Sequence, residues 1–416
     1  MKIYKFGGAS VKDANGVKNV SEIIKAETGD LAIVISAMGK ITNLLETLIK
    51  AYFEKSQHKW DIFLDFKKYH QQINDELFGD GKTPSLVADF FTELEQKLKK
   101  SPSLDFNFEY DQIICFGELT STAIVSEYLN FSGTDNQWID VRTCLRTDDL
   151  YRDANVDWEW TEELTREVFN FKNQKIYITQ GFIGSTVTNQ TTSLGREGSD
   201  FTAAILGSVL NAESVSIWKD VPGVLSADPK KMETTVKIDS LSYREAVEMT
   251  HSGAQVIHPK TMKPLYNKNI PLYVKSFIAP ADSGTVIHAI DHKIKLPPIF
   301  IQKENQVLIT LSPKDFSFIS IEDIDRVVNF LIENRVKVTL MQQSAIDLNI
   351  VIDKPESSLE EIFNELKPYY TIRYNTELTL ITIRHYTEEV LDWMVKEKDI
   401  YLEQHSRLTA RMLVKQ

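Results

Sequence analysis

The sequence predicts an α/β protein, in which a largely parallel sheet is flanked by helices, followed by a smaller C-terminal α+β part. Two observations support this. Short apolar runs alternate with helical periodicity from residue 1 to about 300. Beyond a break at Pro297 and Pro298, the pattern changes to a strand, a helix and two strands, and this order occurs twice. We therefore predict a first domain over 1–298 and a second over 299–416.

The strand-like runs of the first domain are brief and apolar, and helical patterns separate them. The strands are predicted at 3–6, 31–36, 138–141, 175–180, 215–218 and 272–275. The helices are predicted at 17–26, 43–55, 63–77, 86–98, 118–129, 162–169, 201–210 and 243–249. Strands linked by helices form right-handed βαβ units, so ligands are expected at the carboxyl ends of the strands.

The second domain has a different pattern. Strands are predicted at 306–311, 336–341, 346–352, 371–373, 378–383 and 407–414, with helices at 324–332, 359–366 and 388–395. This order favours two small ferredoxin-like units that form a regulatory module. A single α+β domain without a regulatory role is the alternative.

Composition narrows the class of partner. The 416 residues are 42% hydrophobic and carry a formal net charge of −12, which argues against nucleic acid and favours small-molecule substrates. No apolar run is long enough to cross a membrane. Without a secretory signal, Cys115 and Cys144 are expected as reduced thiols in a cytoplasmic protein.

Two segments far apart in the chain have the residues of a phosphoryl-transfer site. KFGGAS at 5–10 follows an apolar strand and places a lysine beside two glycines, whose amides can approach phosphate oxygens. GREGSD at 195–200 opens a helix, with an arginine suited to a carboxylate and an aspartate suited to a metal ion. The GxxxxGK[ST] pattern and the protein-kinase signatures are absent.

Six segments in order resemble the motif set of aspartate kinases in the amino-acid kinase superfamily. They are KFGGAS, SAMGKITNLL at 36–45, FGELTSTA at 116–123, QGFIGS at 180–185, GREGSDFTAA and WKDVPGVLSADPK at 218–230. The resemblance implies an amino-acid-kinase fold and transfer of the ATP γ-phosphoryl group to the side-chain carboxylate of L-aspartate. The product would be 4-phospho-L-aspartate, the first step towards lysine, threonine and methionine, with ATP and Mg²⁺ as cofactors.

The resemblance also implies roles for individual residues. Lys5 would stabilise the transferring phosphoryl group, and Asp200 would organise the nucleotide and Mg²⁺, or else cap a helix. No other protein ligand to the metal is assigned. The substrate-binding set is Thr42, Glu118, Arg196 and Ser199, and the nucleotide-binding set is Gly7, Gly8, Ser36, Lys219, Asp220 and Lys230. Arg196 suits the α-carboxylate and Glu118 the α-ammonium group. Glu118 and Arg196 as a surface pair, and Thr42 as a helix cap, are the alternatives.

The chain departs from the usual pattern at several positions. Lys219, Leu225, Lys230 and Gln255 stand where threonine, an aromatic residue, arginine and lysine are frequent. Lys219 could restore the charge that Gln255 lacks. Glu197 stands where glycine is common, and we expect its carboxylate to point to solvent. His251 and His258 are expected to be structural, because a third metal ligand is missing.

The C-terminal part resembles the paired ACT domains of aspartate kinases. The resemblance implies an amino-acid effector, lysine or threonine, and a homodimer or higher homo-oligomer formed through this module. Thr339 replaces a frequent aspartate, and the chain stops at Gln416 without the usual closing helix and strand, so a pure dimer interface is the alternative. Two other functions stay open: a kinase for another acidic amino acid, and a weakly catalytic amino-acid-binding regulator.

Overall fold

The chain divides into two compact units, which are described separately. The computed structural model describes residues 1–254, 257–292, 294–334, 336–355, 359–396 and 398–415. The first unit takes residues 1–224, 237–247 and 257–292, and the second takes 225–236, 248–254 and the described residues of 294–415. The second unit thus includes two short segments that precede the boundary expected at residue 298. Among the described residues, no helix combines the length and apolar character that crossing a membrane requires.

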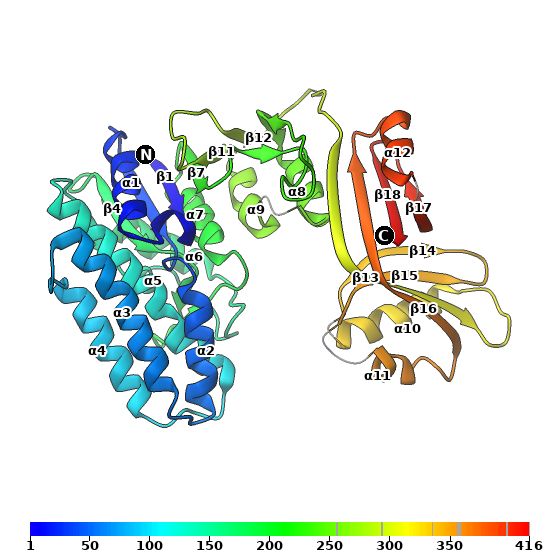
Figure 1. Cartoon of the computed structure of the whole chain (residues 1–416), viewed down its shortest axis with the longest axis horizontal. Helices are drawn as coiled ribbons and strands as arrows, with labels where there is room; N and C mark the ends of the chain where they lie inside the picture. The colour runs from blue at the N-terminus through cyan, green and yellow to red at the C-terminus, as the bar shows by residue number, and fades with distance from the viewer. Residues whose placement is uncertain (255–256, 293, 335, 356–358, 397, 416) are drawn as a thin grey trace. The chain divides into compact units, whose positions relative to one another are not determined.

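The first unit alternates strands with helices (Figure 1). Up to the GREGSD segment its elements are β1 (Lys2–Phe6), η1 (Gly8–Val11), α1 (Ala14–Lys25), β2 (Leu31–Ile35), α2 (Ile41–Phe53), α3 (Lys59–Phe78), α4 (Ser85–Lys99), α5 (Phe106–Phe131), β3 (Gln137–Ile139), η2 (Val141–Thr143), α6 (Trp158–Val168), β4 (Ile176–Gln180), β5 (Ile183–Ser185) and β6 (Thr191–Ser193). After it come α7 (Gly198–Val209), β7 (Ser214–Lys219), β9 (Lys237–Ile238), β10 (Ser240–Ser242), α9 (Pro259–Asn267), β11 (Leu272–Ser276) and β12 (Thr285–His288). Two elements, β8 (Val224–Leu225) and α8 (Tyr243–His251), span points where the chain passes from one unit to the other.

A mostly parallel sheet forms the centre of this unit. Its strand order in the described residues is β10-β12-β11-β7-β1-β2-β4-β3, and the one antiparallel pair is β11 with β12. The strands β2 and β7 are almost completely buried because helices cover both of their faces. This arrangement confirms the predicted α/β class.

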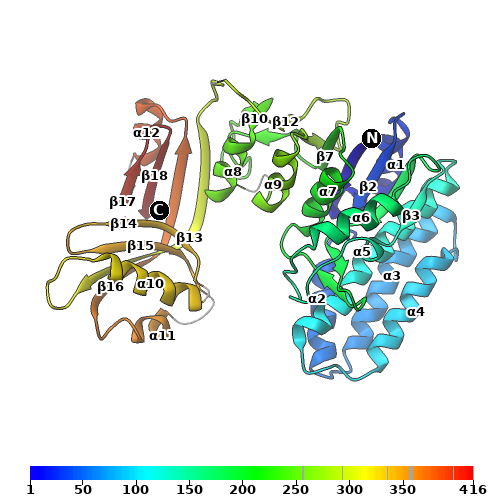
Figure 2. The same cartoon turned by 180° about the vertical axis from the view of Figure 1, so that it is seen from behind.

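Helix α5 is the longest in the first unit and lies under the sheet. It begins after Asp105, whose side chain accepts hydrogen bonds from the backbone N–H groups of Asn107 and Phe108. Gly117 lies in its interior, where an added Cβ would come within 3.0 Å of the Ala37 side chain. The glycine therefore lets the helix approach the loop that follows β2. Figure 2 shows α5 beside β3 and β4, with α3 and α4 on its other side.

The second unit is built on one antiparallel sheet of order β14-β15-β13-β16-β18-β17. Its elements are β13 (Ile299–Pro313), α10 (Ile321–Glu333), β14 (Val338–Gln343), β15 (Leu348–Asp353), α11 (Leu359–Asn364), β16 (Tyr370–Arg384), α12 (Glu388–Val395), β17 (Asp399–His405) and β18 (Thr409–Lys415). The order strand, helix, strand, strand occurs from β13 and again from β16. The predicted pair of ferredoxin-like units is therefore present.

The two halves of this sheet share their central strands. β13 and β16 pair along their whole lengths, with register shifts between Lys303 and Leu308. Asn305 and Glu377 adopt left-handed backbone conformations there, with φ of 57° and 59°. One apolar core lies under α10 and another under α12, while a third cluster takes residues from both halves. Its members are Leu308, Leu340, Val351, Leu378, Leu380, Leu402 and Leu413.

Three sequence-based boundaries were wrong. The strands expected at 371–373 and 378–383 are one strand, β16, and the strand expected from residue 306 begins at Ile299. The helix expected from Glu118 begins twelve residues earlier, at Phe106. Strand β17 had not been predicted, because charged and polar residues interrupt its apolar pattern. In each case tertiary packing, rather than local apolar periodicity, sets the boundary.

Helix α7 packs closely on the sheet at Gly207, where an added Cβ would lie 2.6 Å from the Val215 side chain and 3.2 Å from that of Leu265. We predict that Gly207→Ala lowers the free energy of unfolding by about 1–3 kcal/mol, because the buried, β-branched Val215 cannot move away. Urea-induced unfolding followed by circular dichroism measures the change. Gly29→Ala is the control: it lies in an exposed loop, its added Cβ would meet only Glu27 Oε1 at an ordinary contact distance of 3.6 Å, and it should change the free energy of unfolding by less than about 0.5 kcal/mol. Equal effects of the two substitutions would contradict the prediction.

Candidate active site

The ends of four parallel strands lie in one row. Phe6, the last residue of β1, is in register with Ile35 of β2 on one side and Trp218 of β7 on the other. Ile35 is in turn in register with Gln180, the last residue of β4. The loops that follow these strands therefore start side by side, and they contain four of the six motif segments.

Lys5 and Asp200 form a buried ion pair in this row. The Lys5 Nζ lies 2.6 Å from Asp200 Oδ1, and the side chains are only 11% and 5% exposed. The Lys219 Nζ, from the end of β7, lies 4.0 Å from the other oxygen of Asp200. Asp200 is in the first turn of α7. Two cations and one carboxylate, from three separate segments, thus form the centre of the candidate site.

The two glycines of KFGGAS make a tight turn between β1 and the short helix η1. The Gly39 N–H donates to the Gly8 carbonyl at 3.0 Å. An added Cβ on Gly8 would lie 2.6 Å from the Ala37 carbonyl oxygen and 3.0 Å from that of Gly39. Backbone atoms on the opposite loop leave no space for a side chain, so glycine is required at this position. Ser36, at the start of that loop, donates its N–H to Phe6 and accepts from Ser121 Oγ at 2.8 Å.

Glu118 lies on α5 directly beneath the loop after β2. One carboxylate oxygen accepts from the Ala37 N–H at 3.3 Å, and the other has no hydrogen-bond partner among the described residues. The residue is 3% exposed. Burial raises the pKa of Glu118 to about 8, although the Ala37 N–H and the Lys5 charge act in the opposite direction. Such a carboxyl group is suited to a cationic ligand group, which would favour its ionised form.

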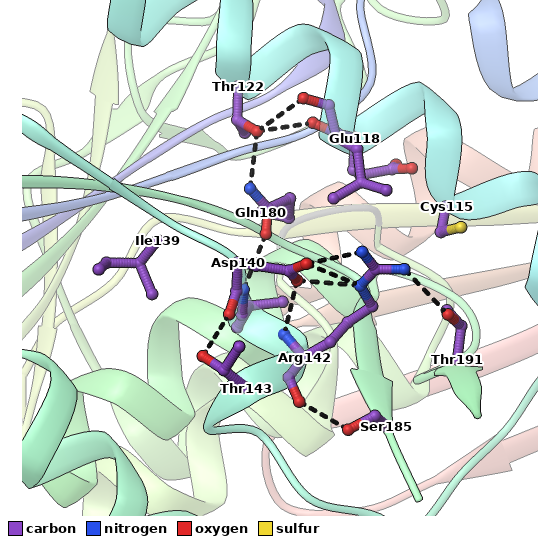
Figure 3. A network of polar contacts seen from close by, with 12 residues as sticks. Cys115, Glu118, Thr122, Ile139, Asp140, Arg142, Thr143, Gln180, Ser185 and Thr191 are labelled. Carbon is purple, nitrogen blue, oxygen red and sulfur yellow. Dashed lines mark hydrogen bonds and ion pairs between the residues drawn. The ribbon is translucent and has the colours of Figure 1, made fainter. Parts of the chain in front are cut away.

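A polar network connects α5 with the strand ends and with β6 (Figure 3). The Gln180 side chain accepts from the Val141 N–H at 2.8 Å and donates to Thr122 Oγ1, also at 2.8 Å. Arg142 forms a two-point pair with Asp140 and donates to Thr191 Oγ1 at 3.1 Å. The network fixes the helix that carries Glu118 relative to the strand that leads into GREGSD.

The GREGSD segment presents its residues in different ways. Arg196 is exposed and has no ion-pair partner in the described part of the chain, so it is available to a ligand. Ser199 is buried at the start of α7, where it packs against Gly181, the residue after β4. An added Cβ on Gly181 would lie 2.6 Å from Ser199 Oγ. Arg196 and Glu118 do not form the surface pair that was the alternative.

Glu197 does not behave as the sequence suggested. Its backbone is left-handed, with φ of 56°, at the residue that caps α7, and its side chain makes no capping hydrogen bond. Its Oε2 atom is shielded from solvent and has no hydrogen-bond partner among the described residues. Glu197 is half-buried, so its carboxylate is not freely exposed as expected, and one of its oxygens is shielded by the protein. Glycine would fit the left-handed turn before α7 without strain.

The segment after β7 is fixed against strand β12, two places away in the sheet. Thr285 Oγ1 accepts from the Val224 N–H at 2.8 Å, and an added Cβ on Gly223 would lie 2.5 Å from the same oxygen. Asp220 is exposed beside this turn. Lys230, whose N–H donates to the Asp228 carboxylate at 2.9 Å, and Leu225 belong to the second unit.

Three other residues singled out in the sequence are Thr42, His258 and Gln255. Thr42 lies in the first turn of α2, and because Lys40 is the N-cap of that helix, the capping alternative for Thr42 is wrong. His258 caps α9 by accepting from the Lys260 N–H at 3.1 Å. Within the described ranges, no group of three or more histidine, cysteine or acidic side chains could hold a metal ion. Gln255 lies outside the described residues.

The fold and the row of strand ends define a class of protein. Residues 1–276 match the model of the amino acid kinase family. The chain therefore belongs to this family, as the six motifs indicated.

Two relatives and two related structures narrow the class. The chain is 32% identical to the lysine-sensitive aspartokinase 3 of Escherichia coli over 86% of its own length and 79% of that protein. The chain is also 33% identical to a bifunctional aspartokinase/homoserine dehydrogenase of Arabidopsis thaliana, and the match covers 68% of this chain and 32% of the Arabidopsis protein. The E. coli aspartokinase III structures with lysine and aspartate, and with aspartate and ADP, superpose with TM-scores of 0.83 and 0.84 at 26% identity. Both cover 100% of this chain and 96% of the other. Within the family, the chain groups with the aspartokinases.

Sequence reasoning missed the polar residues that hold these loops. They are Asp111, Gln112, Thr122, Gln180 and Thr285. A signal for some of them was present. Asp111, Glu118 and Thr122 are spaced by seven and four residues in an otherwise apolar segment, which puts them on one face of a helix.

We predict that Glu197→Gly raises the free energy of unfolding by about 1–2 kcal/mol, because glycine adopts φ of 56° without strain and no shielded carboxylate remains. Urea-induced unfolding followed by tryptophan fluorescence measures this change. Glu197→Gln is the control, since it removes the charge but keeps the left-handed residue, and it should stabilise less than the glycine. Loss of stability in Glu197→Gly would show instead that the carboxylate makes a favourable contact.

Proposed function

We propose that this chain transfers the γ-phosphoryl group of ATP to the side-chain carboxylate of L-aspartate and releases ADP and 4-phospho-L-aspartate. The buried arrangement of Lys5, Asp200 and Lys219 at the strand ends carries this proposal. Membership of the aspartokinases and the aspartate and ADP named for the E. coli relative support it. The pathway inferred from the family leads to lysine, threonine and methionine.

The reaction needs charge neutralisation more than acid–base chemistry. A carboxylate with a pKa near 4 is already ionised at neutral pH, so no base has to activate it. The obstacle is repulsion between the acceptor and the phosphate chain. Lys5, with the amides of Gly7 and Gly8, would face the transferring phosphoryl group and stabilise its charge in the transition state. Asp200 holds the Lys5 ammonium group at 2.6 Å and would keep it in place before substrates bind.

Aspartate recognition is assigned to residues from α2, α5, the loop before α7 and the first turn of α7. Arg196, exposed and without an ion-pair partner in the described chain, would grip the α-carboxylate in a two-point fork. Glu118 would accept the α-ammonium group, and Thr42 and Ser199 would complete the site. A ligand that lacks the ammonium group would leave Glu118 buried and unmatched, so the site would discriminate against it.

The nucleotide is assigned to the other side of Asp200. Within the first unit, Ser36, Lys219 and Asp220 would border ATP. Mg²⁺ bound with nucleotide phosphates needs one or two protein carboxylates, and the buried Asp200 in the first turn of α7 fits this requirement. When bound, the metal ion would neutralise charge on the phosphates.

The second unit is assigned to regulation and assembly. Its two ferredoxin-like halves and the lysine named for the E. coli relative support an amino-acid effector site, with lysine as the first candidate and threonine as the second. We infer that this unit joins two copies of the chain in a homodimer or a higher oligomer. The alternative is a dimer interface that binds no effector. A cytoplasmic location is consistent with small-molecule substrates.

A hydroxamate assay tests the reaction directly, because hydroxylamine traps acyl phosphates. With ATP and Mg²⁺, we expect turnover with L-aspartate and at least about 100-fold less with glutamate or N-acetylglutamate. Lys5→Met should lower kcat by about 10²–10³-fold while the protein stays folded, which shows that turnover arises at this site. Turnover with another acidic amino acid would identify a different kinase, and no turnover with any acceptor would favour a binding regulator. Lysine and threonine added at millimolar concentrations test the effector in the same assay.

The KM for aspartate should depend on pH through Glu118. The pKa of this group in the free protein is about 8, so its carboxyl group is mostly protonated at pH 6–7 and must lose its proton to accept an ammonium group. The KM for aspartate should therefore fall by up to about tenfold per pH unit between pH 6 and pH 8.

Steady-state kinetics at constant ionic strength measure this dependence. Glu118→Gln should raise the KM for aspartate and flatten its pH dependence, while leaving the KM for ATP within about twofold. A steep pH dependence that survives in Glu118→Gln would assign the titration to another group.

A further inference from the structure

Helix α5 holds strand β6, which leads into residues 194–197, called here the Arg196 loop. Gln112 donates from Nε2 to the Thr191 carbonyl at 2.8 Å and accepts from the Thr191 N–H at 3.3 Å. One residue earlier on the helix, Asp111 accepts from the Ser193 N–H at 2.9 Å and from Ser193 Oγ at 2.6 Å. The side chains of α5 thus replace a neighbouring strand for β6.

Asp111 also holds a second segment of chain. Its Oδ2 atom accepts from the Arg152 N–H at 2.9 Å, so one carboxylate accepts three hydrogen bonds from two segments, strand β6 and the loop at Arg152. The side chain is fully buried. Burial raises the pKa of Asp111 to about 6, while the hydrogen bonds from Ser193 and Arg152 limit the rise, so the group is ionised at neutral pH.

The segment held through Arg152 packs against the residue before Arg196. Gly195 has φ of 77°, and an added Cβ there would lie 2.7 Å from Asp153 Oδ1 and 3.3 Å from the Arg152 carbonyl oxygen. The Ala154 N–H donates to the Ser193 carbonyl at 2.9 Å. Residues 152–154 therefore pack against the start of the Arg196 loop, while α5 holds the strand β6 before it. Asp111 contacts both of these segments, through Arg152 and through Ser193.

We infer that Asp111 is a positioning residue for the acceptor substrate: it fixes the backbone path from which Arg196 presents its guanidinium group. The Arg196 side chain is exposed and has no ion-pair partner in the described chain, so its own contacts do not define its direction. The direction comes from the backbone, and a small displacement of a binding group weakens a two-point contact. This inference rests on the proposed role of Arg196 in binding aspartate.

Asp111→Asn tests the inference, since it keeps the size of the side chain but removes its charge and one acceptor oxygen. We expect the KM for aspartate to rise about tenfold and the KM for ATP to change by less than about twofold. Ser193→Ala removes only the Oγ donor, at 2.6 Å, and should raise the KM for aspartate by a smaller factor. This milder variant keeps the test valid if Asp111→Asn does not fold.

Glu109→Gln is the matched control. Glu109 is a second buried carboxylate on the same helix and is 2% exposed. It pairs with the Lys97 Nζ at 2.6 Å and accepts from the Ser103 N–H at 2.7 Å, and neither partner belongs to the segments that Asp111 holds. Its substitution should lower thermal stability without changing either KM by more than about twofold. If Asp111→Asn and Glu109→Gln act alike on both KM values, Asp111 is only a structural residue and the inference is wrong.

Arg196→Ala separates this inference from the function on which it rests. If that variant leaves the KM for aspartate unchanged, the proposed role of Arg196 fails. If it raises this KM and Asp111→Asn does not, only the inference fails. In the double variant, Asp111→Asn should raise the KM for aspartate by less than about twofold beyond the value in Arg196→Ala, because both changes act on the same interaction with aspartate. Independent, multiplying effects would contradict the inference.

Discussion

The candidate site depends on the register of four parallel strands. Because β1 is paired in phase with β2 and β7, and β2 with β4, Phe6, Ile35, Trp218 and Gln180 end at one level. A shift by one residue would turn Lys5 to the opposite face of the sheet, away from Asp200. The glycine turn after β1 and the Lys5–Asp200 ion pair depend on this alignment, because both lie where these strands end.

Helix α5 supplies the second constraint, and it is a polar one. Its face towards the loops carries Asp111, Glu118 and Thr122, which are buried in an otherwise apolar helix. Asp111 accepts from Ser193 and Arg152, Glu118 accepts from Ala37, and Thr122 accepts from Gln180, so the helix aligns segments that are distant in sequence. The energetic cost of burying these groups is offset only if all of the loops are in place. Assembly of the site and folding of this unit are therefore linked.

Much of this architecture could be predicted from the sequence. Short apolar runs between helical patterns predicted the parallel sheet, and the glycine segments predicted one site at the carboxyl ends of its strands that includes Lys5 and Asp200. The ion pair between these two residues was not predicted. The conformation of Glu197 could not be predicted, since a left-handed residue next to a helix is set by the turn and not by residue preference. Likewise, the pKa shifts of Glu118 and Asp111 arise from burial by segments far along the chain, which local patterns do not contain.

The second unit shows why its two repeats differ from two separate domains. The strands β13 and β16 each run through both halves, and the cluster that includes Leu308 and Leu413 takes side chains from both. Each half has its own core under its helix, but neither has a complete sheet, and the third cluster belongs to both. The unit should therefore melt as one cooperative body, and neither half can be exchanged for that of a relative without replacing strands of the other. A ligand that shifts a central strand in one half must also move the corresponding strand of its neighbour.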